Sequence, residues 1–148
     1  MSGYVIDASV AVKWLVTEAL SEQASALLVD KERALIAPDL LFAEASNALW
    51  AMCRRGDIDR RDFAEAIETL KAAPVATPIP MRRLAAAAAR LASDLDHPTY
   101  DCFYLALAVQ EQYTLITADR RFYDVVRRHP YLSDRMAHLA SLAADSRP

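Results

Sequence analysis

The stretch Tyr4-Val5-Ile6-Asp7 decides how this chain of 148 residues is expected to fold. Its apolar run indicates a short buried strand, and the strand ends at an acidic residue. Residues 9–16 then have helical character, with Ser9 as the expected N-cap. A buried strand followed at once by a helix is the first unit of an α/β arrangement.

Two further apolar runs repeat this pattern along the chain. Residues 34–37 form one, and Leu115-Ile116-Thr117-Ala118-Asp119 contains the other, again ending near an acid. Residues 119–128 are predicted to form a short helix after this last run. Short apolar strands that alternate with helices predict an α/β fold with a mainly parallel sheet flanked by helices.

The remaining segments are mostly helical. Helices are predicted over residues 21–31 with Ser21 as cap, 40–55, 59–73 with Asp59 as cap, 81–95, and about 99–112. Residues 74–80 carry three prolines, so they can hold at most a short edge strand. Residues 136–142 fit either a last strand or a helix. We expect a single domain over residues 1–142, and a frayed tail over residues 143–148.

Composition excludes several classes of protein. With only 2 glycines, the chain has no Gly-rich loop that could cradle a phosphate or a dinucleotide. Its net charge of −3 implies no global attraction to nucleic acid, although 14 of the 17 basic residues are arginines, which suit phosphate contacts. Cys53 and Cys102 show neither a disulfide framework nor metal-ligand spacing. We see no secretory signal and no apolar run of membrane-spanning length, so a cytoplasmic protein is the expectation.

Four acids stand in apolar surroundings. Asp7 ends the first strand, Glu44 interrupts an apolar helix, Asp101 opens another helix, and Asp119 follows a later strand. Isolated carboxylates are costly to bury, so their positions need an explanation. Because sites in parallel sheets form at the carboxyl ends of the strands, we expect the four to converge there on a divalent metal ion.

The type of ligand narrows the choice of ion. A site of three or four carboxylates without histidine or cysteine suits Mg²⁺ or Mn²⁺ and argues against Zn²⁺. Such an ion can activate a water and stabilise the leaving oxygen of a phosphodiester. The number of ions, one or two, stays open.

Each candidate also has a simpler interpretation. Asp7 and Asp119 could only cap helices, Asp101 could only respond to a helix dipole, and Glu44 could belong to a buried ion pair. The hydroxyls of Ser9 and Thr117 either hold a ligand or serve local structure. Asp124 could be a fifth ligand, although a solvated helical acid is the better interpretation. His97 and His129 are interpreted as turn residues beside prolines.

Four segments resemble a known family. They are Val5-Ile6-Asp7-Ala8-Ser9-Val10, Leu41-Phe42-Ala43-Glu44-Ala45-Ser46-Asn47-Ala48-Leu49, Tyr100-Asp101-Cys102-Phe103-Tyr104-Leu105-Ala106-Leu107-Ala108 and Leu115-Ile116-Thr117-Ala118-Asp119. Together they resemble the PIN-domain ribonucleases, and among them the VapC-like toxins of type II toxin–antitoxin pairs.

The resemblance implies a PIN-like three-layer sandwich around a five-stranded sheet. It also implies a Mg²⁺- or Mn²⁺-dependent endoribonuclease, with Asp7, Glu44, Asp101 and Asp119 around the ion. Arg120 and Arg121 are the arginines closest in sequence to that site, and we expect them to hold the RNA. The resemblance further implies a homodimer, neutralised by a small antitoxin whose tail occupies the active-site groove.

The same residues are compatible with two other functions. An aspartyl-phosphate phosphatase would use Asp7 as nucleophile, but it needs a second acid two residues later, where this chain has Ser9. A binding or regulatory module would use the acids for a structural ion or for helix caps, without turnover. It predicts that carboxylate-to-amide changes alter stability and leave RNA untouched.

Overall fold

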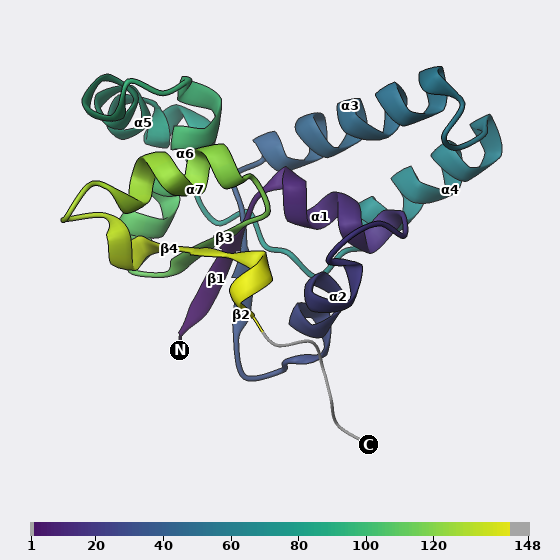
Figure 1. Cartoon of the computed structure of the whole chain (residues 1–148), viewed down its shortest axis with the longest axis horizontal. Helices are drawn as coiled ribbons and strands as arrows, with labels where there is room; N and C mark the ends of the chain where they lie inside the picture. Colours follow the sequence, from purple (N-terminus) through teal and green to yellow (C-terminus); the bar gives the residue numbers. More distant parts are fainter. Residues whose placement is uncertain (1, 143–148) are drawn as a thin grey trace.

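A four-stranded parallel sheet forms the centre of the molecule in the computed structural model, which describes residues 2–142 (Figure 1). The strands are β1 (Gly3–Ile6), β2 (Ala34–Ile36), β3 (Thr114–Thr117) and β4 (Met136–His138). Their order is β2-β1-β3-β4, and each neighbouring pair is parallel. The predicted parallel α/β arrangement is therefore confirmed.

Helices flank this sheet. They are α1 (Ala8–Leu15), α2 (Ser21–Val29), α3 (Leu40–Arg55), α4 (Arg60–Lys71), α5 (Met81–Leu95), α6 (Thr99–Glu111) and α7 (Arg120–Arg127), with short 3₁₀ turns at Ser133–Arg135 and Leu139–Ser141. The core lies between sheet and helices, where Val5, Ile6, Leu115 and Ile116 are fully buried. Burial of such aliphatic side chains is the main favourable term in folding.

The predicted fifth strand is wrong. Residues 74–80 contribute a single β-bridge, between Ala76 and Ile36, supported by hydrogen bonds from the Ala37 amide to the Ala76 carbonyl and from the Ala76 amide to the Leu35 carbonyl. Pro74, Pro78 and Pro80 have no amide hydrogen to donate, so a longer ladder cannot form. The sheet within residues 2–142 consequently has four strands.

Helix starts differ in two places from the predicted caps. Asp7, rather than Ser9, is the N-cap of α1, because its carboxylate accepts from the Val10 amide. Ser21 is the first residue of α2, after Leu20 in a left-handed conformation, and its hydroxyl accepts from the Glu18 amide instead. The predicted cap of α4 at Asp59 is confirmed by its bond from the Asp62 amide.

The carboxyl-terminal segment, which fitted either a strand or a helix, forms β4 followed by one 3₁₀ turn. Parallel pairing of Leu115 with Met136 places β4 beside β3, at the edge of the sheet. The predicted frayed tail at residues 143–148 lies outside the described residues. Within residues 2–142, none of the helices combines the length and apolar character that a bilayer crossing requires.

Helices α3 and α4 form an arm that projects from the body of the molecule at the upper right of Figure 1. Gly56 ends α3 in a left-handed conformation with φ of 86°, and the chain then reverses into α4. The base of the arm packs on α1 through a second, smaller apolar cluster centred on Val12, Ala45 and Leu70. Glu44 lies near this base, on α3.

Candidate metal centre

Two strand ends bring two of the four acids to one edge of the sheet. Asp7 directly follows β1, and Asp119 comes two residues after β3, its parallel neighbour. Each carboxylate also starts a helix: Asp7 accepts from the Val10 amide at 3.3 Å, and Asp119 caps α7. Helix amino ends favour negative charge, so the same geometry that caps the helices gathers carboxylates at this edge.

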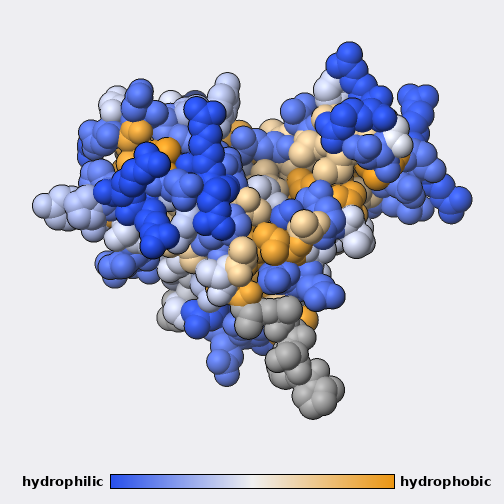
Figure 2. All heavy atoms as spheres, viewed as in Figure 1, coloured by the Kyte–Doolittle hydropathy of each residue, from blue (hydrophilic) through white to orange (hydrophobic). Residues whose placement is uncertain are grey.

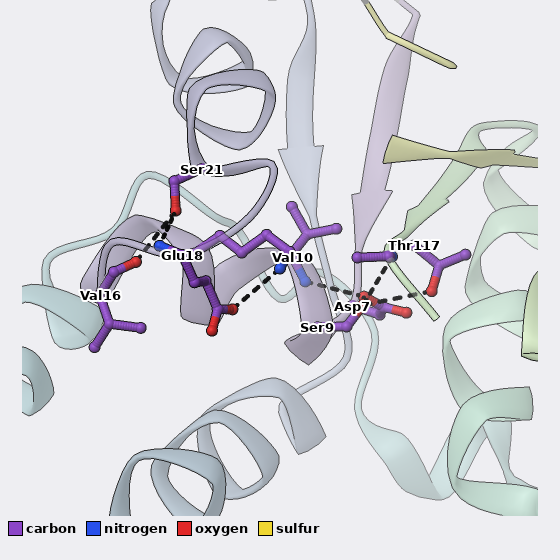
Figure 3. Close-up of polar contacts among 9 residues, drawn as sticks. Asp7, Ser9, Val10, Val16, Glu18, Ser21 and Thr117 are labelled. Carbon is purple, nitrogen blue, oxygen red and sulfur yellow. Dashed lines mark hydrogen bonds and ion pairs between the residues drawn. The ribbon is translucent and has the colours of Figure 1, made fainter. Parts of the chain in front are cut away.

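Asp7 is the most buried of the four acids, with 5% of its surface exposed. The Ser9 hydroxyl donates to its Oδ1 at 2.5 Å, and a hydrogen bond from Thr117 also favours the charged form (Figure 3). Burial outweighs both and raises the pKa of Asp7 to about 7, with a further contribution from the charge of Asp101. A nearby cation would strongly favour the ionised form of a carboxylate that is buried in this way.

The hydroxyls of Ser9 and Thr117 join the ends of β1 and β3. The Ser9 Oγ accepts from the Ala118 amide at 2.9 Å and lies 3.4 Å from the Thr117 Oγ1. The Thr117 Oγ1 in turn accepts from the Asp119 amide at 3.0 Å. Both predicted candidates therefore contact the surroundings of Asp7, and they fix its orientation through backbone groups of the neighbouring strand.

Glu44 reaches the same region from α3. Its Oε1 accepts a 2.6 Å hydrogen bond from the hydroxyl of Tyr104, which is buried on α6. Burial raises the pKa of Glu44, and the charge of Asp101 raises it further. Burial and the adjacent Glu44 also raise the pKa of the Tyr104 hydroxyl, so this group stays a donor.

The charge of Asp101 acts on two of the other acids, Asp7 and Glu44. Asp101 lies in the first turn of α6, and its negative charge raises the pKa of both Asp7 and Glu44. Its Oδ2 lies 2.7 Å from the Nε2 of His97. The charge of Asp101 thus acts on carboxylates from two other segments, as expected where acidic groups surround a site for a cation.

Asp119 is less closely associated with this group. Its Oδ1 accepts from the Arg121 amide at 3.0 Å and from the Phe122 amide at 3.2 Å, as an N-cap does. The charges that raise the pKa of Asp7 and Glu44 include Asp101 but not Asp119. Asp119 therefore caps α7 through Oδ1, and a role toward an ion rests on its other oxygen.

The donor type of the cluster fits Mg²⁺ or Mn²⁺. Only carboxylate oxygens are offered by Asp7, Glu44 and Asp101, and hard cations prefer oxygen ligands. Within residues 2–142, no group of three or more His, Cys, Asp or Glu side chains lies in an arrangement that could hold a metal ion. Mg²⁺ keeps several waters and needs only one or two direct carboxylates, so the cluster suits this ion better than one that demands a full protein cage.

The predicted RNA-binding arginines occupy the first turn of α7. Arg120 and Arg121 are exposed, and Arg120 lies over the Tyr123 ring with its guanidinium carbon 5.4 Å from the ring centre. Figure 2 shows hydrophilic side chains gathered over α5 and α7. Asp124, the possible fifth ligand, lies on α7, where its charge acts on His138.

Two residues of the site were missed in the sequence. The sequence predicts only a helical position for Tyr104 and only a turn beside Pro98 for His97. For Tyr104 the spacing contained a usable signal, because Tyr104 follows Asp101 by three residues within α6 and therefore lies on a neighbouring helical position. His97 lies in the turn before α6, so helical spacing gives no such signal for it.

Known proteins similar to this chain agree with the fold. The family model described as "PIN domain" matches residues 4–128. Among solved structures, the crystal structure of PAE2754 from Pyrobaculum aerophilum is similar with a TM-score of 0.68 and 20% sequence identity, covering 95% of this chain and 92% of that one. This likeness concerns the fold alone. No curated protein matches the chain.

Proposed function

Because the chain belongs to the PIN domain family, whose members are commonly nucleases, we propose that it is a Mg²⁺- or Mn²⁺-dependent endoribonuclease. The observation that carries this proposal is the buried Asp7, whose pKa is raised to about 7 beside the charge of Asp101. Burying a carboxylate next to another one costs stability, and a divalent cation would offset that cost. Binding of a divalent cation would therefore account for a buried carboxylate that lowers the stability of the metal-free protein.

The proposed site divides the work among the acids. Asp7 and Asp101 would hold the ion directly, while Glu44 and Asp119 would complete the acidic cluster and help to orient the attacking water. A bound divalent ion would lower the pKa of that water and stabilise charge on the phosphodiester. Ser9 and Thr117 would keep Asp7 in its orientation, through the hydrogen bonds described above.

The RNA backbone would be held by arginines. Arg120 and Arg121 are exposed at the start of α7, directly after Asp119, so they would meet phosphates close to the acidic cluster. Arginine can bind a phosphate through two parallel hydrogen bonds, which fixes the strand as well as attracting it.

We further propose that the protein is the toxin of a type II toxin–antitoxin pair, acts as a homodimer, and is inhibited by a small antitoxin. An open cavity of about 290 Å³ beside Ser9 and Ala118 is lined by the apolar Val12, Ala48 and Met52 and by the ion pair of Lys13 and Glu18. Its apolar part would take apolar side chains of the antitoxin tail. Figure 2 shows hydrophobic surface between α1 and α3. A basic residue on that tail would suit the adjacent acids.

The aspartyl-phosphate phosphatase is not favoured by these contacts. The position two residues after Asp7 is Ser9, whose hydroxyl donates to the carboxylate and cannot serve as the second acid. The binding module without turnover has one supporting observation, since the carboxylate of Asp119 serves as a helix cap. It remains the alternative that the following experiment addresses.

The test is cleavage of a panel of structured RNAs by the full chain, with Mg²⁺ or Mn²⁺ and with EDTA. The proposal predicts internal cleavage that requires the ion and stops on chelation. Thermal unfolding with and without the ion accompanies it, because an ion that binds the native state stabilises it. A protein that binds the ion and cleaves none of the RNAs would support the binding module.

A further inference from the structure

His97 occupies an unusual place for a turn residue, because its side chain is almost completely buried. It follows α5 and Asp96, which has a left-handed backbone with φ of 50°, and its amide donates to the Ala92 carbonyl at 3.1 Å. This turn directs the imidazole inward. Its Nε2 then lies 2.7 Å from the Oδ2 of Asp101, one of the acids of the cluster.

Packing against α7 holds the imidazole in this orientation. The ring stacks on Phe122 with centroids 4.7 Å apart and an interplanar angle of 15°. Phe122 is fully buried, and its amide donates to the carboxylate of Asp119. The ring of His97 therefore lies between the element that carries Asp101 and the helix that Asp119 caps.

The exposed fractions of the two side chains indicate that His97 supports Asp101 and does not bind the ion itself. The side chain of His97 is 7% exposed, and that of Asp101 is 30% exposed. The carboxylate of Asp101 is thus the more accessible of the two groups to an ion and its waters. A buried hydrogen-bond partner of a metal-binding residue commonly orients that residue toward the metal.

We propose that His97 is a positioning residue that holds the carboxylate of Asp101 for the divalent ion. An ionised carboxylate only accepts hydrogen bonds, so the His97 Nε2–H donates to Oδ2. This bond uses the Oδ2 of Asp101. Among the side-chain hydrogen bonds of residues 2–142, none uses its Oδ1, which would be available to the ion. This inference rests on the proposed function of the acidic cluster.

The experiment measures the affinity of the full-length, metal-free protein for Mn²⁺, by calorimetry or by the spin resonance of free Mn²⁺, at one fixed pH. His97→Phe keeps an aromatic ring against Phe122 and removes the donor. His97→Gln places an amide N–H near the position of Nε2. His129→Phe controls for the loss of a histidine, because His129 lies two residues beyond the carboxyl end of α7.

Loss of an outer partner of a metal ligand typically weakens metal binding by roughly 10–100-fold, and this is the loss expected for His97→Phe. His97→Gln is expected to retain most of the affinity, and His129→Phe all of it. Rescue by glutamine separates the hydrogen bond from the packing of the ring. His97→Leu serves as a second variant without the donor if His97→Phe fails to fold.

Three results would overturn the inference. Mn²⁺ affinity in His97→Phe equal to that of the unmodified protein, with binding lost in Asp7→Asn, would reject the role of His97 and leave the proposed function standing. An equal loss in His97→Phe and His97→Gln, with both folded, would show that the hydrogen bond is not the cause. A native chain that fails to bind Mn²⁺ would reject both.

Discussion

The hydroxyl of Tyr104 donates a 2.6 Å hydrogen bond to the Oε1 of Glu44 across 60 positions of the chain. Among the side-chain hydrogen bonds of residues 2–142, it is the one that links α6 to α3. Since α3 belongs to the projecting arm, this bond holds the acid of the arm against the helix that carries Asp101.

Tyr104→Phe removes this hydrogen bond and leaves the ring in place. We expect the free energy of unfolding to fall by about 1–2 kcal/mol, because the half-buried carboxylate loses its partner. RNA cleavage should fall by roughly 10-fold, since Glu44 is no longer held. Urea unfolding and a cleavage assay measure the two effects. Tyr131→Phe is the matched control, because Tyr131 is 87% exposed. Equal behaviour of the two variants would contradict the role of this bond.

Asp7→Asn should stabilise the metal-free protein near neutral pH. The pKa of Asp7 is about 7 in the folded state, whereas an aspartate in the unfolded chain has the ordinary value of 3.8. Between these two pH values the folded state therefore binds more protons than the unfolded state. The contribution of Asp7 to stability therefore declines as the pH rises from about 4 to about 7. Asparagine is neutral at every pH in this range, so the stability of the Asp7→Asn variant should not show this decline.

The expected gain at pH 7.5 in EDTA is on the order of 1–3 kcal/mol, and it should shrink toward pH 4. Urea unfolding of both proteins at several pH values measures it. A variant that is less stable than the native sequence at pH 7.5 would show that Asp7 is ionised at little cost.

Asp119→Asn separates the capping role of this residue from a role toward the ion. Asparagine caps helices about as well as aspartate, so stability should change by less than about 0.5 kcal/mol, whereas Asp119→Ala should cost about 1 kcal/mol. RNA cleavage should fall in both variants if the free oxygen of Asp119 serves the ion. Full cleavage by Asp119→Asn would restrict Asp119 to its cap.

Gly3→Ala should destabilise the start of β1. A Cβ at this position would lie 2.6 Å from the Ala34 carbonyl oxygen and would also clash with the Tyr113 ring. Overpacking of this kind costs about 1–3 kcal/mol. At Gly56 a Cβ meets open space, so Gly56→Ala should cost only the strain of its positive φ, about 1 kcal/mol. Thermal unfolding ranks the two, and a smaller effect at Gly3 would contradict the described strand pairing.

Much of the fold followed from local patterns. The run Tyr4-Val5-Ile6-Asp7 predicted β1 and the acid at its end, and the alanine-rich composition of residues 81–95 predicted α5 with its observed bounds. The proline-rich residues 74–80 were predicted to hold at most a short edge strand and form one bridge, while the fifth strand came from the resemblance. The helix preference of alanine, the strand preference of short apolar runs and the missing amide hydrogen of proline act locally, so these elements were accessible without tertiary information.

The contacts of the site were less accessible. Asp7 competes with Ser9 for the same cap position, and the outcome depends on the Thr117 and Ala118 groups of a strand far along the chain. His97 gains its role from a left-handed turn at Asp96 and from stacking on Phe122. Such tertiary contacts leave no periodic trace in the sequence, so neither this choice of cap nor the role of His97 could be found there.

The central claim is that the carboxylate cluster around Asp7 cleaves RNA with a divalent ion. The most direct test compares cleavage of the same RNA panel in Mn²⁺ by the native chain, by Asp7→Asn, and by Asp94→Asn, whose carboxylate is exposed on α5. We predict cleavage by the native chain and by Asp94→Asn, and none above the EDTA control by Asp7→Asn. Cleavage by a folded Asp7→Asn at the native rate would contradict the claim.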